Sequence, residues 1–371
     1  MAPVSRVEVI ATGPGMPPVQ FSGLAPPALA TMTVVKLTDE DGTVGIASYD
    51  TDSYEKFDLV PLESVGPLAA YVLGKDPNSR SRISGGLRDL LPSSVSAPGP
   101  ASAFDAALWD LAAKKAGLPL YQLLGGMREE IAGYASLSLA KTDDECIEQV
   151  SAAHAAGFGS VKVHVSGDPR LDARTAMRLR ESFSGIEIML DAEGAYDRRG
   201  AAFVGAALQE IDARWFEAPL PDQDLTGYRQ LRNRLTVPVL PAGGSIWDLR
   251  ALASILSDPP WDAVRSAASL GGGITFACQL AGLASGFGID VELSSYGFGL
   301  TQAVNLHLML GLGIGSYFEQ PFPAQPWAFG LAEELPFGYG STYHAPDAPG
   351  LGIALNDSEI DAAAVARFVV E

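Results

Sequence analysis

The stretch from Val161 to Pro221 decides the fold, because it holds three short apolar segments that each end in charged residues. They are VKVHV at 161–165, IEIMLDAE at 186–193 and RWFEAPLP at 214–221. Runs of this length that are rich in Val and Ile are typical of parallel strands buried on both faces. A charge in such a strand is costly unless it reaches water, a metal or a partner. We therefore expect one polar site at the strand ends. Its candidate residues are Lys162, His164, Asp191, Glu193 and Glu217.

The alternation of strand and helix continues on both sides of this stretch. Candidate strands begin near Ile131, Ser160, Ile186, Arg214, Val237, Asp262, Ile289 and Ser316. Successive starts lie roughly 23–29 residues apart, which is the length of a strand plus a crossover helix. Eight such units predict an α/β fold, a closed (β/α)8 TIM barrel, rather than an open sheet. The triplet Gly271-Gly272-Gly273 could cradle a phosphate at a helix start, but tight strand-to-helix packing explains it equally well.

Residues 1–128 predict a separate α+β capping domain. Val4–Ile10, Thr31–Leu37 and Thr43–Ser48 are strand candidates, and Asp41-Gly42 suits a hairpin turn between the last two. Ala101–Ala116 has apolar residues at helical spacing and ends before a glycine.

Two segments of this domain are loop candidates, Gly13–Pro27 because it is rich in Gly and Pro and Ser48–Tyr54 because it is polar. Residues 129–350 would form the barrel. Residues 351–371 would pack back on the capping domain through a helix at Asp357–Val370.

Composition limits the possible partners. The formal net charge is −19, which argues against nucleic acid and anionic membrane surfaces. Cys146 and Cys278 lie far apart in the chain, so no disulfide framework is indicated. The N-terminus lacks a signal-peptide core, and no run of about twenty apolar residues is present, so we expect a soluble, cytoplasmic protein.

The strand ends place chemistry in the barrel mouth. Residues two apart in a strand share a face, so Lys162 and His164 would both point inward, while Asp191, Glu217 and Glu319 would enter from strands 3, 4 and 8. Two carboxylates on adjacent strands can bind Mg²⁺, and a neighbouring Lys and His suit abstraction of a proton. Simpler interpretations remain open. Lys162 and His164 could belong to a mouth salt bridge, Asp191 could cap a helix, and Glu193 could be a solvated residue. His307 is better explained as a packing histidine.

This arrangement resembles the enolase superfamily, and within it the mandelate racemase/muconate lactonising enzyme group. Ala103–Gly126 resembles the helix that links cap to barrel. Val161–His164 resembles the strand-2 Lys-x-Lys motif, with His in the second position. Asp191–Tyr196 and Glu217-Ala218-Pro219 resemble the first and second metal-ligand motifs. Gly272–Thr275 is similar to the turn after strand 6, and Phe318–Gln320 resembles the strand-8 glutamate segment. The resemblance implies that the loops at Gly13–Pro27 and Ser48–Tyr54 close over a substrate, with Gln20, Phe21, Tyr49 and Tyr54 giving a partly apolar closure.

Several positions depart from the pattern that the resemblance implies. Gly244 stands where a carboxylate usually supplies the third metal ligand, which puts Mg²⁺ binding in doubt. Ala267 and Leu270 stand at the positions of the strand-6 aspartate and lysine, and Ser294 at that of the strand-7 histidine. The base on the second face is therefore missing. Glu193 could supply a displaced third ligand.

Arg265 and Glu292 lie two residues before Ala267 and Ser294 and should also point inward. A buried Arg265–Glu292 ion pair is the simpler expectation. The alternative is that Arg265 and Lys162 together replace the metal as a clamp on a substrate carboxylate.

The resemblance implies a lyase or isomerase that abstracts the α-proton of a small carboxylate substrate. Lys162 would orient the carboxylate and His164 would take the proton, with Asp191 and Glu217 holding Mg²⁺. Glu319, Arg265, Tyr296 and Ser294 would contact the substrate. With one base, dehydration or cycloisomerisation is favoured over racemisation. A metal-independent acid–base enzyme and a non-catalytic metabolite-binding protein are the alternatives. Barrels of this family are often oligomers, so a homo-oligomer is expected.

Overall fold

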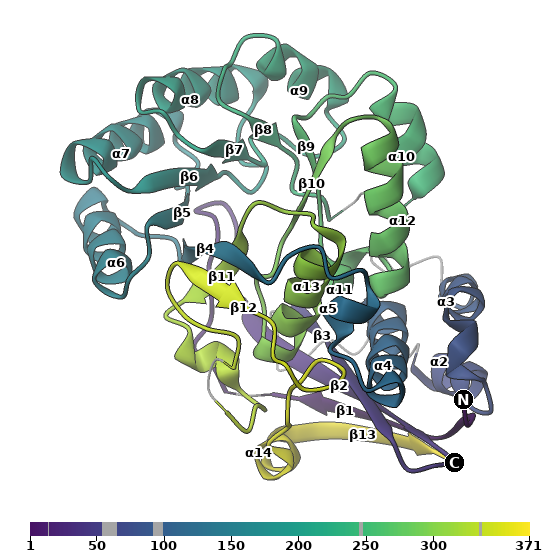
Figure 1. Cartoon of the computed structure of the whole chain (residues 1–371). Coiled ribbons are helices and arrows are strands. Elements are labelled where there is room, and N and C mark those ends of the chain that lie inside the picture. The colour runs from purple at the N-terminus through teal and green to yellow at the C-terminus, as the bar shows by residue number, and fades with distance from the viewer. Residues whose placement is uncertain (14, 54–64, 92–98, 245–247, 334–335) are drawn as a thin grey trace.

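Eight parallel strands in chain order build the barrel (Figure 1). This computed structural model describes all residues except 14, 54–64, 92–98, 245–247 and 334–335. The barrel strands are β4 (Glu130–Leu137), β5 (Ser160–His164), β6 (Glu187–Asp191), β7 (Trp215–Glu217), β8 (Val239–Leu240), β9 (Ala263–Ser266), β10 (Asp290–Leu293) and β11 (Phe318–Phe322). Each expected strand start lies within two residues of an observed one. The prediction of a (β/α)8 barrel behind an N-terminal capping domain is confirmed.

The pairing of the strands sets which residues are neighbours at the mouth. β4 to β8 pair in sequence order, β11 returns to pair with β4, and β9 pairs with β10. Asp262 donates its backbone N–H to the carbonyl of Val239 at 3.0 Å, which links β8 to the start of β9. The register aligns His164 with Asp191 and Asp191 with Glu217. Three of the predicted site residues therefore form one row across the ends of β5, β6 and β7.

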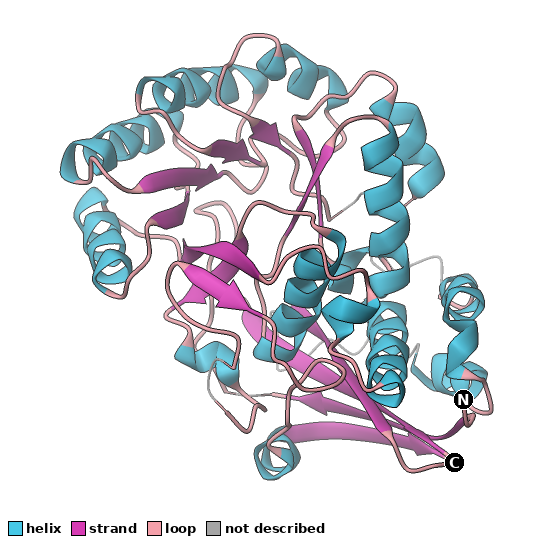
Figure 2. Ribbon diagram, viewed as in Figure 1, coloured by secondary structure: helices cyan, strands magenta, loops and turns pink. Residues whose placement is uncertain are grey.

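Helices cover the outside of the barrel (Figure 2). They are α6 (Asp143–Ala155), α7 (Pro169–Ser182), α8 (Arg198–Glu210), α9 (Leu225–Arg232), α10 (Leu249–Leu256), α11 (Ala268–Gly271), α12 (Gly273–Gly286) and α13 (Gly299–Leu312). Polar side chains cap the first five of these at their N-termini. For example, Asp168 accepts backbone N–H bonds at the start of α7 and Asp197 does so at the start of α8.

The capping domain is built on an antiparallel sheet of order β13-β1-β2-β3. Its strands are β1 (Val4–Thr12), β2 (Leu29–Asp39), β3 (Val44–Ser53) and β13 (Ala364–Val370). The helices α2 (Val65–Val72), α3 (Arg80–Asp89) and α4 (Gly99–Ala116) complete it, and α4 agrees with the helix expected at 101–116. The two chain ends lie side by side, because Arg6 pairs with Glu371 at 2.8 Å (Figure 1).

Shorter elements connect these parts. They are η1 (Pro77–Ser79), α5 (Leu120–Leu123), η2 (Gln325–Ala328), β12 (Thr342–His344) and α14 (Asp357–Ala363).

Two expectations about the capping domain are wrong. Residues 48–53 are not a loop but the second half of β3, where Thr51 pairs with Thr31 of β2. Tyr54 lies outside the described residues. The expected C-terminal helix ends at Ala363, and residues 364–370 form β13, which pairs with β1. The alternating, β-branched sequence AVARFVV favours a strand once an open sheet edge is available.

The glycine triplet serves contact between the two domains. Gly272 donates its N–H to the Ser102 hydroxyl at 3.0 Å, and Thr275 donates its N–H to Asp105 at 2.9 Å. A Cβ on Gly273 would lie 2.4 Å from the Asp105 carboxylate. These amides are thus occupied by side chains of α4, which supports the interpretation of close packing over that of a phosphate cradle.

Candidate active site

The predicted site residues meet in one cavity of about 310 Å³ between the strand ends and the capping domain. From β5, β6, β7 and the residues that follow them come Lys162, His164, Asp191, Glu193 and Glu217. Arg265, Ser294, Tyr296 and Glu319 line it from the other half of the barrel. Gly244 also lines the cavity and offers no side chain, as the sequence indicated.

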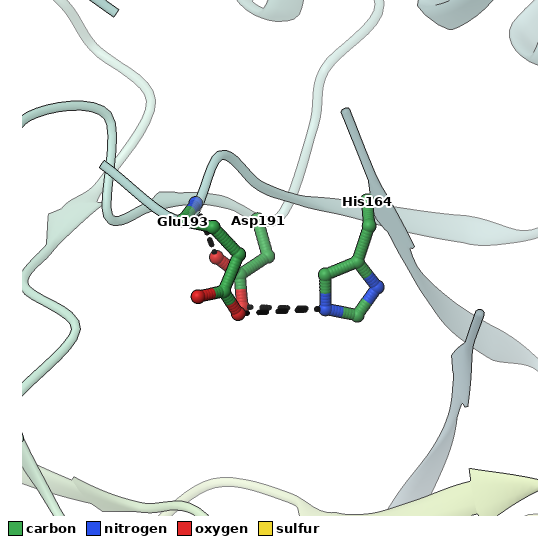
Figure 3. Close-up of side chains that lie close together, drawn as sticks. All are labelled: His164, Asp191 and Glu193. Carbon is green, nitrogen blue, oxygen red and sulfur yellow. Dashed lines mark hydrogen bonds and ion pairs between the residues drawn. The ribbon is translucent and has the colours of Figure 1, made fainter. Parts of the chain in front are cut away.

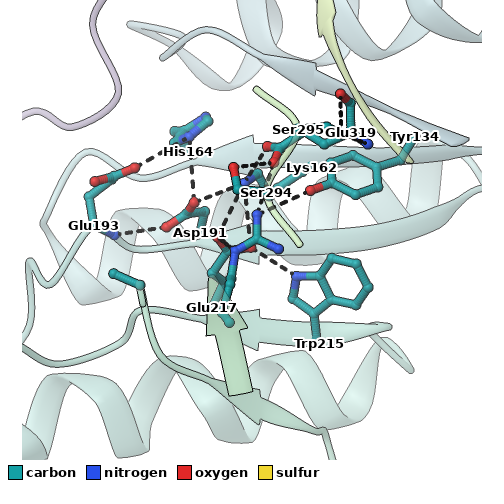
Figure 4. A network of polar contacts seen from close by, with 12 residues as sticks. Tyr134, Lys162, His164, Asp191, Glu193, Trp215, Glu217, Ser294, Ser295 and Glu319 are labelled. Atoms are coloured by element: carbon teal, nitrogen blue, oxygen red, sulfur yellow. Dashed lines mark hydrogen bonds and ion pairs between the residues drawn. The ribbon is translucent and has the colours of Figure 1, made fainter. Parts of the chain in front are cut away.

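Lys162 is the centre of a buried network of ionic contacts (Figure 4). Its Nζ lies 3.1 Å from Asp191 Oδ2, 3.3 Å from Glu217 Oε1 and 2.6 Å from Glu319 Oε1. Burial lowers the pKa of this ammonium, but the surrounding carboxylates more than reverse that effect and hold the pKa well above its usual value. Lys162 therefore stays charged and neutralises acids from three strands.

Arg265 is the second buried cation. Its Nε lies 2.6 Å from Glu217 Oε1 and its Nη2 lies 2.9 Å from Glu319 Oε2. The expected Arg265–Glu292 pair is wrong. Glu292 instead accepts the backbone N–H of Ser316 at 2.9 Å, and Ser316 lies just before the first residue of β11. Arg265 is long enough to reach across the barrel, where two carboxylates accept from its planar guanidinium.

Glu217 has both carboxylate oxygens engaged by protein donors. Arg265 and Lys162 contact Oε1, and the indole N–H of Trp215 donates to Oε2 at 3.2 Å. A metal ion held by Asp191 and Glu217 would have to displace or share these donors. With Gly244 in the third position, the residues present do not fit the metal site that the resemblance implied.

Asp191 also belongs to a second cluster, which it forms with His164 of β5 and with Glu193 just after β6 (Figure 3). Single ligand atoms of His164, Asp191 and Glu193 all lie within 4.8 Å of one another. His164 Nε2 lies 3.7 Å from Asp191 Oδ2 and 3.8 Å from Glu193 Oε1. Asp191 and Glu193 are thus positioned to hold a divalent cation through oxygen.

A backbone hydrogen bond determines the tautomer of His164. The Nδ1 atom lies 2.6 Å from the carbonyl oxygen of Leu137, an acceptor, so Nδ1 carries the proton. The lone pair is therefore on Nε2, which faces the cavity carboxylates. Burial lowers the pKa of His164 despite the neighbouring Asp191, and this keeps the imidazole neutral.

The two carboxylates beside His164 differ in their electrostatics. Burial opposes ionisation of Asp191, but the charge of Lys162 outweighs it and the pKa of Asp191 is lowered. The negative charge on Asp191, together with burial, raises the pKa of Glu193 to about 8. At neutral pH this pair holds a proton that a cation would replace.

Backbone turns aim these side chains. Glu193 and Ala218 both have positive φ, at 50° and 45°, which is uncommon for residues other than glycine. Two hydrogen bonds join the turns, from Ala192 N–H to the Glu217 carbonyl at 2.9 Å and from Gly194 N–H to the Ala218 carbonyl at 2.8 Å. The conformation at Glu193 turns its carboxylate back toward His164.

Hydrogen-bonded serines and Glu319 form the opposite side of the cavity as far as the structure describes it. Ser294 donates to Glu319 Oε2 at 2.9 Å, and Ser295 both donates to and accepts from the Glu319 backbone. Ala267 lines this side where the resemblance expects an aspartate. Among the described residues of this half, no histidine or lysine lines the cavity.

Sequence reasoning missed part of the cavity wall. Of the four residues expected to close it, Phe21 does so, whereas Tyr49 is buried in the core and Gln20 bonds the backbone of its own loop. Trp327 and Asp50 complete the wall. The position of Asp50 in a polar segment was visible in the sequence, but its inward direction depends on the unexpected length of β3.

Comparison with known proteins agrees with this architecture. Residues 6–125 match the mandelate racemase/muconate lactonizing enzyme N-terminal domain, and residues 145–359 match the enolase C-terminal domain-like family. Among solved structures, a mandelate racemase/muconate lactonizing enzyme family protein from Pseudovibrio sp. superposes with a TM-score of 0.93 at 29% identity, covering 99% of each chain.

Two curated relatives have named activities. L-talarate/galactarate dehydratase of Salmonella typhimurium is 30% identical over 70% of this chain, and the match spans 63% of that relative. Its structure with Mg and L-lyxarohydroxamate superposes with a TM-score of 0.85 at 22% identity, covering 99% of this chain and 94% of that one. D-galactarolactone cycloisomerase of Agrobacterium fabrum is 25% identical over 87% of this chain and 88% of its own. Within the described part of the chain, no helix has the length and apolar character needed to cross a membrane.

Proposed function

The chain belongs to the mandelate racemase/muconate lactonizing enzyme group of the enolase superfamily, and from this membership we propose that it abstracts the α-proton of a small carboxylic acid. The product of this step is an enolate, which then expels a leaving group from the β-carbon: water in a dehydration, or the ring's own carboxylate when a lactone is opened in a cycloisomerisation. The reaction class is therefore that of a lyase or isomerase. The names of the two curated relatives, a dehydratase and a cycloisomerase, support this class.

The observation that carries the proposal is the state of His164. Its Nδ1 proton is held by the Leu137 carbonyl, and its bare Nε2 faces a cavity of ligand size. A neutral imidazole held in one tautomer is ready to accept a proton from carbon. His164 is thus the base, and the proton it accepts resides on Nε2 beside Asp191, whose negative charge stabilises the imidazolium.

Lys162 and Arg265 prepare the electrostatics of the same cavity. They hold Glu217 and Glu319 in place and keep the pKa of Glu319 well below its usual value, whereas burial raises the pKa of Glu217 to about 8. They also place two positive charges where negative charge develops on the substrate. We place the substrate carboxylate beside Arg265 and Lys162, and its enolate oxygen within reach of Ser294.

The asymmetry of the cavity favours one-base chemistry. Racemisation needs a second base on the opposite face, and that side offers Ser294 and Ala267 among the described residues. Dehydration and cycloisomerisation need a single base on carbon, and a protonated group can then assist departure of the leaving group. His164, once protonated, can serve that role.

A divalent cation fits this chain through Asp191 and Glu193 rather than through Asp191 and Glu217. Their oxygens suit Mg²⁺, which is commonly held by one or two carboxylates with water and substrate. When bound, such a cation would supply Lewis-acid stabilisation of the enolate. The engagement of Glu217 by Arg265 also favours a second candidate, an enzyme in which Arg265 and Lys162 do this work without a metal ion.

Exchange of α-protons in deuterium oxide tests the proposal. Purified protein would be incubated with and without Mg²⁺ against a panel of sugar acids and amino acids, and substrate deuteration would be followed by NMR. We expect exchange with at least one acid. Failure of the whole panel to exchange would argue for the non-catalytic alternative. Assembly into a homo-oligomer stays a prediction.

A further inference from the structure

Carboxyl groups outnumber cations in this cavity. Those of Asp50, Asp191, Glu193, Glu217 and Glu319 line it, and the cations among the described lining residues are Lys162 and Arg265, so five acids face two cations. Asp191 and Glu193 share a proton at neutral pH, and burial raises the pKa of Glu217 to about 8, so not all five acids are charged. Both cations are already engaged by Asp191, Glu217 and Glu319. A second carboxylate on the substrate would therefore meet no further cation among these residues, which opposes entry of a dianion into a buried site.

One wall of the same cavity is aromatic. The rings of Phe21 and Tyr296 meet edge to face with their centroids 5.1 Å apart. The rings of Tyr296 and Trp327 do so with their centroids 4.8 Å apart. Phe21 also lies 5.4 Å from the ring of His164, so the wall begins beside the base. All three rings line the cavity, and Trp327 is 95% buried (5% exposed).

An acid stands next to this wall. Asp50 accepts the backbone N–H of Phe298 at 2.9 Å, and the ring of Phe298 packs against Trp327 at 5.3 Å. Asp50 comes from β3 of the capping domain, whereas Lys162 and Arg265 come from the barrel. The acid of the wall is therefore contributed by a different domain from the cations that balance Glu217 and Glu319.

We propose that the aromatic wall and Asp50 bind an organic ammonium group, so that the substrate is a zwitterionic acid. Aromatic faces attract cations through their quadrupole, and the attraction grows when water is excluded. The substrate carboxylate would lie toward Arg265 and its ammonium toward Phe21, Tyr296 and Trp327. Because Phe21 touches His164, the ammonium would be attached at or next to the carbon that loses its proton.

This inference rests on the proposed function and specifies its substrate class. The dehydratase and the cycloisomerase described above are named for sugar acids, and the aromatic wall offers hydroxyl groups of such molecules few partners. The shortage of cations and the aromatic wall point to the same chemistry from independent observations.

Matched probes separate charge from shape. Glycine betaine and N-trimethylalanine carry a trimethylammonium group, and 3,3-dimethylbutanoate and 2,3,3-trimethylbutanoate are their uncharged carbon isosteres. Binding of all four, and of galactarate, would be measured by calorimetry on the full chain with and without Mg²⁺. We expect each ammonium acid to bind at least tenfold more tightly than its isostere, and galactarate to bind more weakly than either ammonium acid.

Variants locate the subsite. Asp50→Asn keeps an oxygen for the Phe298 N–H and should lower affinity for the ammonium acids while leaving the isosteres unchanged. Phe21→Leu should reduce the preference for the ammonium acids over their isosteres. Phe21 is chosen because it is less buried than Trp327. Asp144→Asn, an exposed acid outside the cavity, and Phe203→Leu, an exposed ring, are the controls and should change neither.

The outcomes distinguish this proposal from the function on which it rests. Equal binding of an acid and its isostere, binding of none of the ammonium acids, or tighter binding of galactarate would overturn the ammonium subsite. Proton exchange with sugar acids alone would overturn it too, yet leave the proposed reaction intact. Tight ammonium binding without exchange in any acid would support the subsite and contradict the reaction.

Discussion

Arg265 Nε lies 2.6 Å from Glu217 Oε1 in the interior of the barrel, and both side chains are more than 95% buried. This contact favours the charged form of Glu217, although burial outweighs it and raises the pKa of that carboxyl to about 8. It also ties β7 to β9 across a part of the barrel where β8 contributes a strand of two residues, Val239–Leu240. The pair therefore serves both electrostatics and packing.

Removal of this cation should destabilise the protein. Arg265→Met leaves Glu217 and Glu319 with one fewer buried partner, and breaking a buried ion pair in this way costs about 3–5 kcal/mol. Urea unfolding at pH 7 measures the loss. Arg265→Lys keeps the charge and should lose less. A loss below ~1 kcal/mol for Arg265→Met would show that the network does not depend on Arg265.

The position of a divalent cation can be tested by charge removal at two sites. Glu193→Gln should weaken Mg²⁺ or Mn²⁺ binding at least ~tenfold, because it removes the negative charge of one of two carboxylate ligands. Glu217→Gln is the matched variant and should leave affinity nearly unchanged, because Arg265 and Lys162 already occupy that carboxylate. Calorimetric titration gives both affinities. The reverse order of effects would return the site to Glu217.

Acid should destabilise the protein through His307, which was expected to be a packing residue. It is fully buried in α13, its Nε2 lies 3.1 Å from the Leu351 carbonyl, and its Nδ1 accepts the Tyr121 N–H. Burial lowers the pKa of His307 to about 4, from an ordinary value near 6.5. The folded state thus favours the neutral ring. The contribution of His307 to the free energy of unfolding is complete above pH 6.5 and is lost as the pH falls from 6.5 through 4.

The magnitude of that loss is at most about 3 kcal/mol, from the linkage of protonation to folding. The free energy of unfolding would be measured between pH 7 and pH 4 for the native protein and for His307→Gln. The variant cannot titrate and should show a shallower decline. Parallel curves for the two proteins would rule out His307 as the source.

Gly273 tests the junction between the domains. Its φ is +84°, and an added Cβ would lie 2.4 Å from the Asp105 carboxylate, so Gly273→Ala should cost at least ~2 kcal/mol. Gly282→Ala in the same helix is the control, because its Cβ would meet nothing within 4 Å. That change should stabilise by roughly 0.5–1 kcal/mol. Thermal unfolding compares them, and equal effects would mean that the Asp105 contact is not rigid.

The sequence was sufficient for the barrel and for which residues gather at its mouth. Strand periodicity and the charged strand ends are local signals, so Lys162, His164 and Asp191 were found directly. The position of Glu319 at strand 8 was found in the same way, and the resemblance added the meaning of Gly244. These positions needed no knowledge of side-chain direction beyond the alternation of a strand.

Contacts across the barrel could not be predicted in the same way. Arg265 and Glu292 are neighbours in register, yet the guanidinium reaches Glu217 and Glu319 while Glu292 bonds Ser316. Which carboxylate receives a long side chain depends on packing in three dimensions. The strand β13 was missed for a related reason, because its residues form a strand only where the edge of β1 is available.

Proton exchange in a single variant shows whether His164 is the base. His164→Ala would be compared with His344→Ala, an exposed histidine outside the cavity, using whichever acid the native protein deuterates. Our account predicts that exchange falls by roughly 10²–10⁴-fold in His164→Ala, with the fold retained, and is unchanged in His344→Ala. Exchange by His164→Ala at the native rate would contradict it.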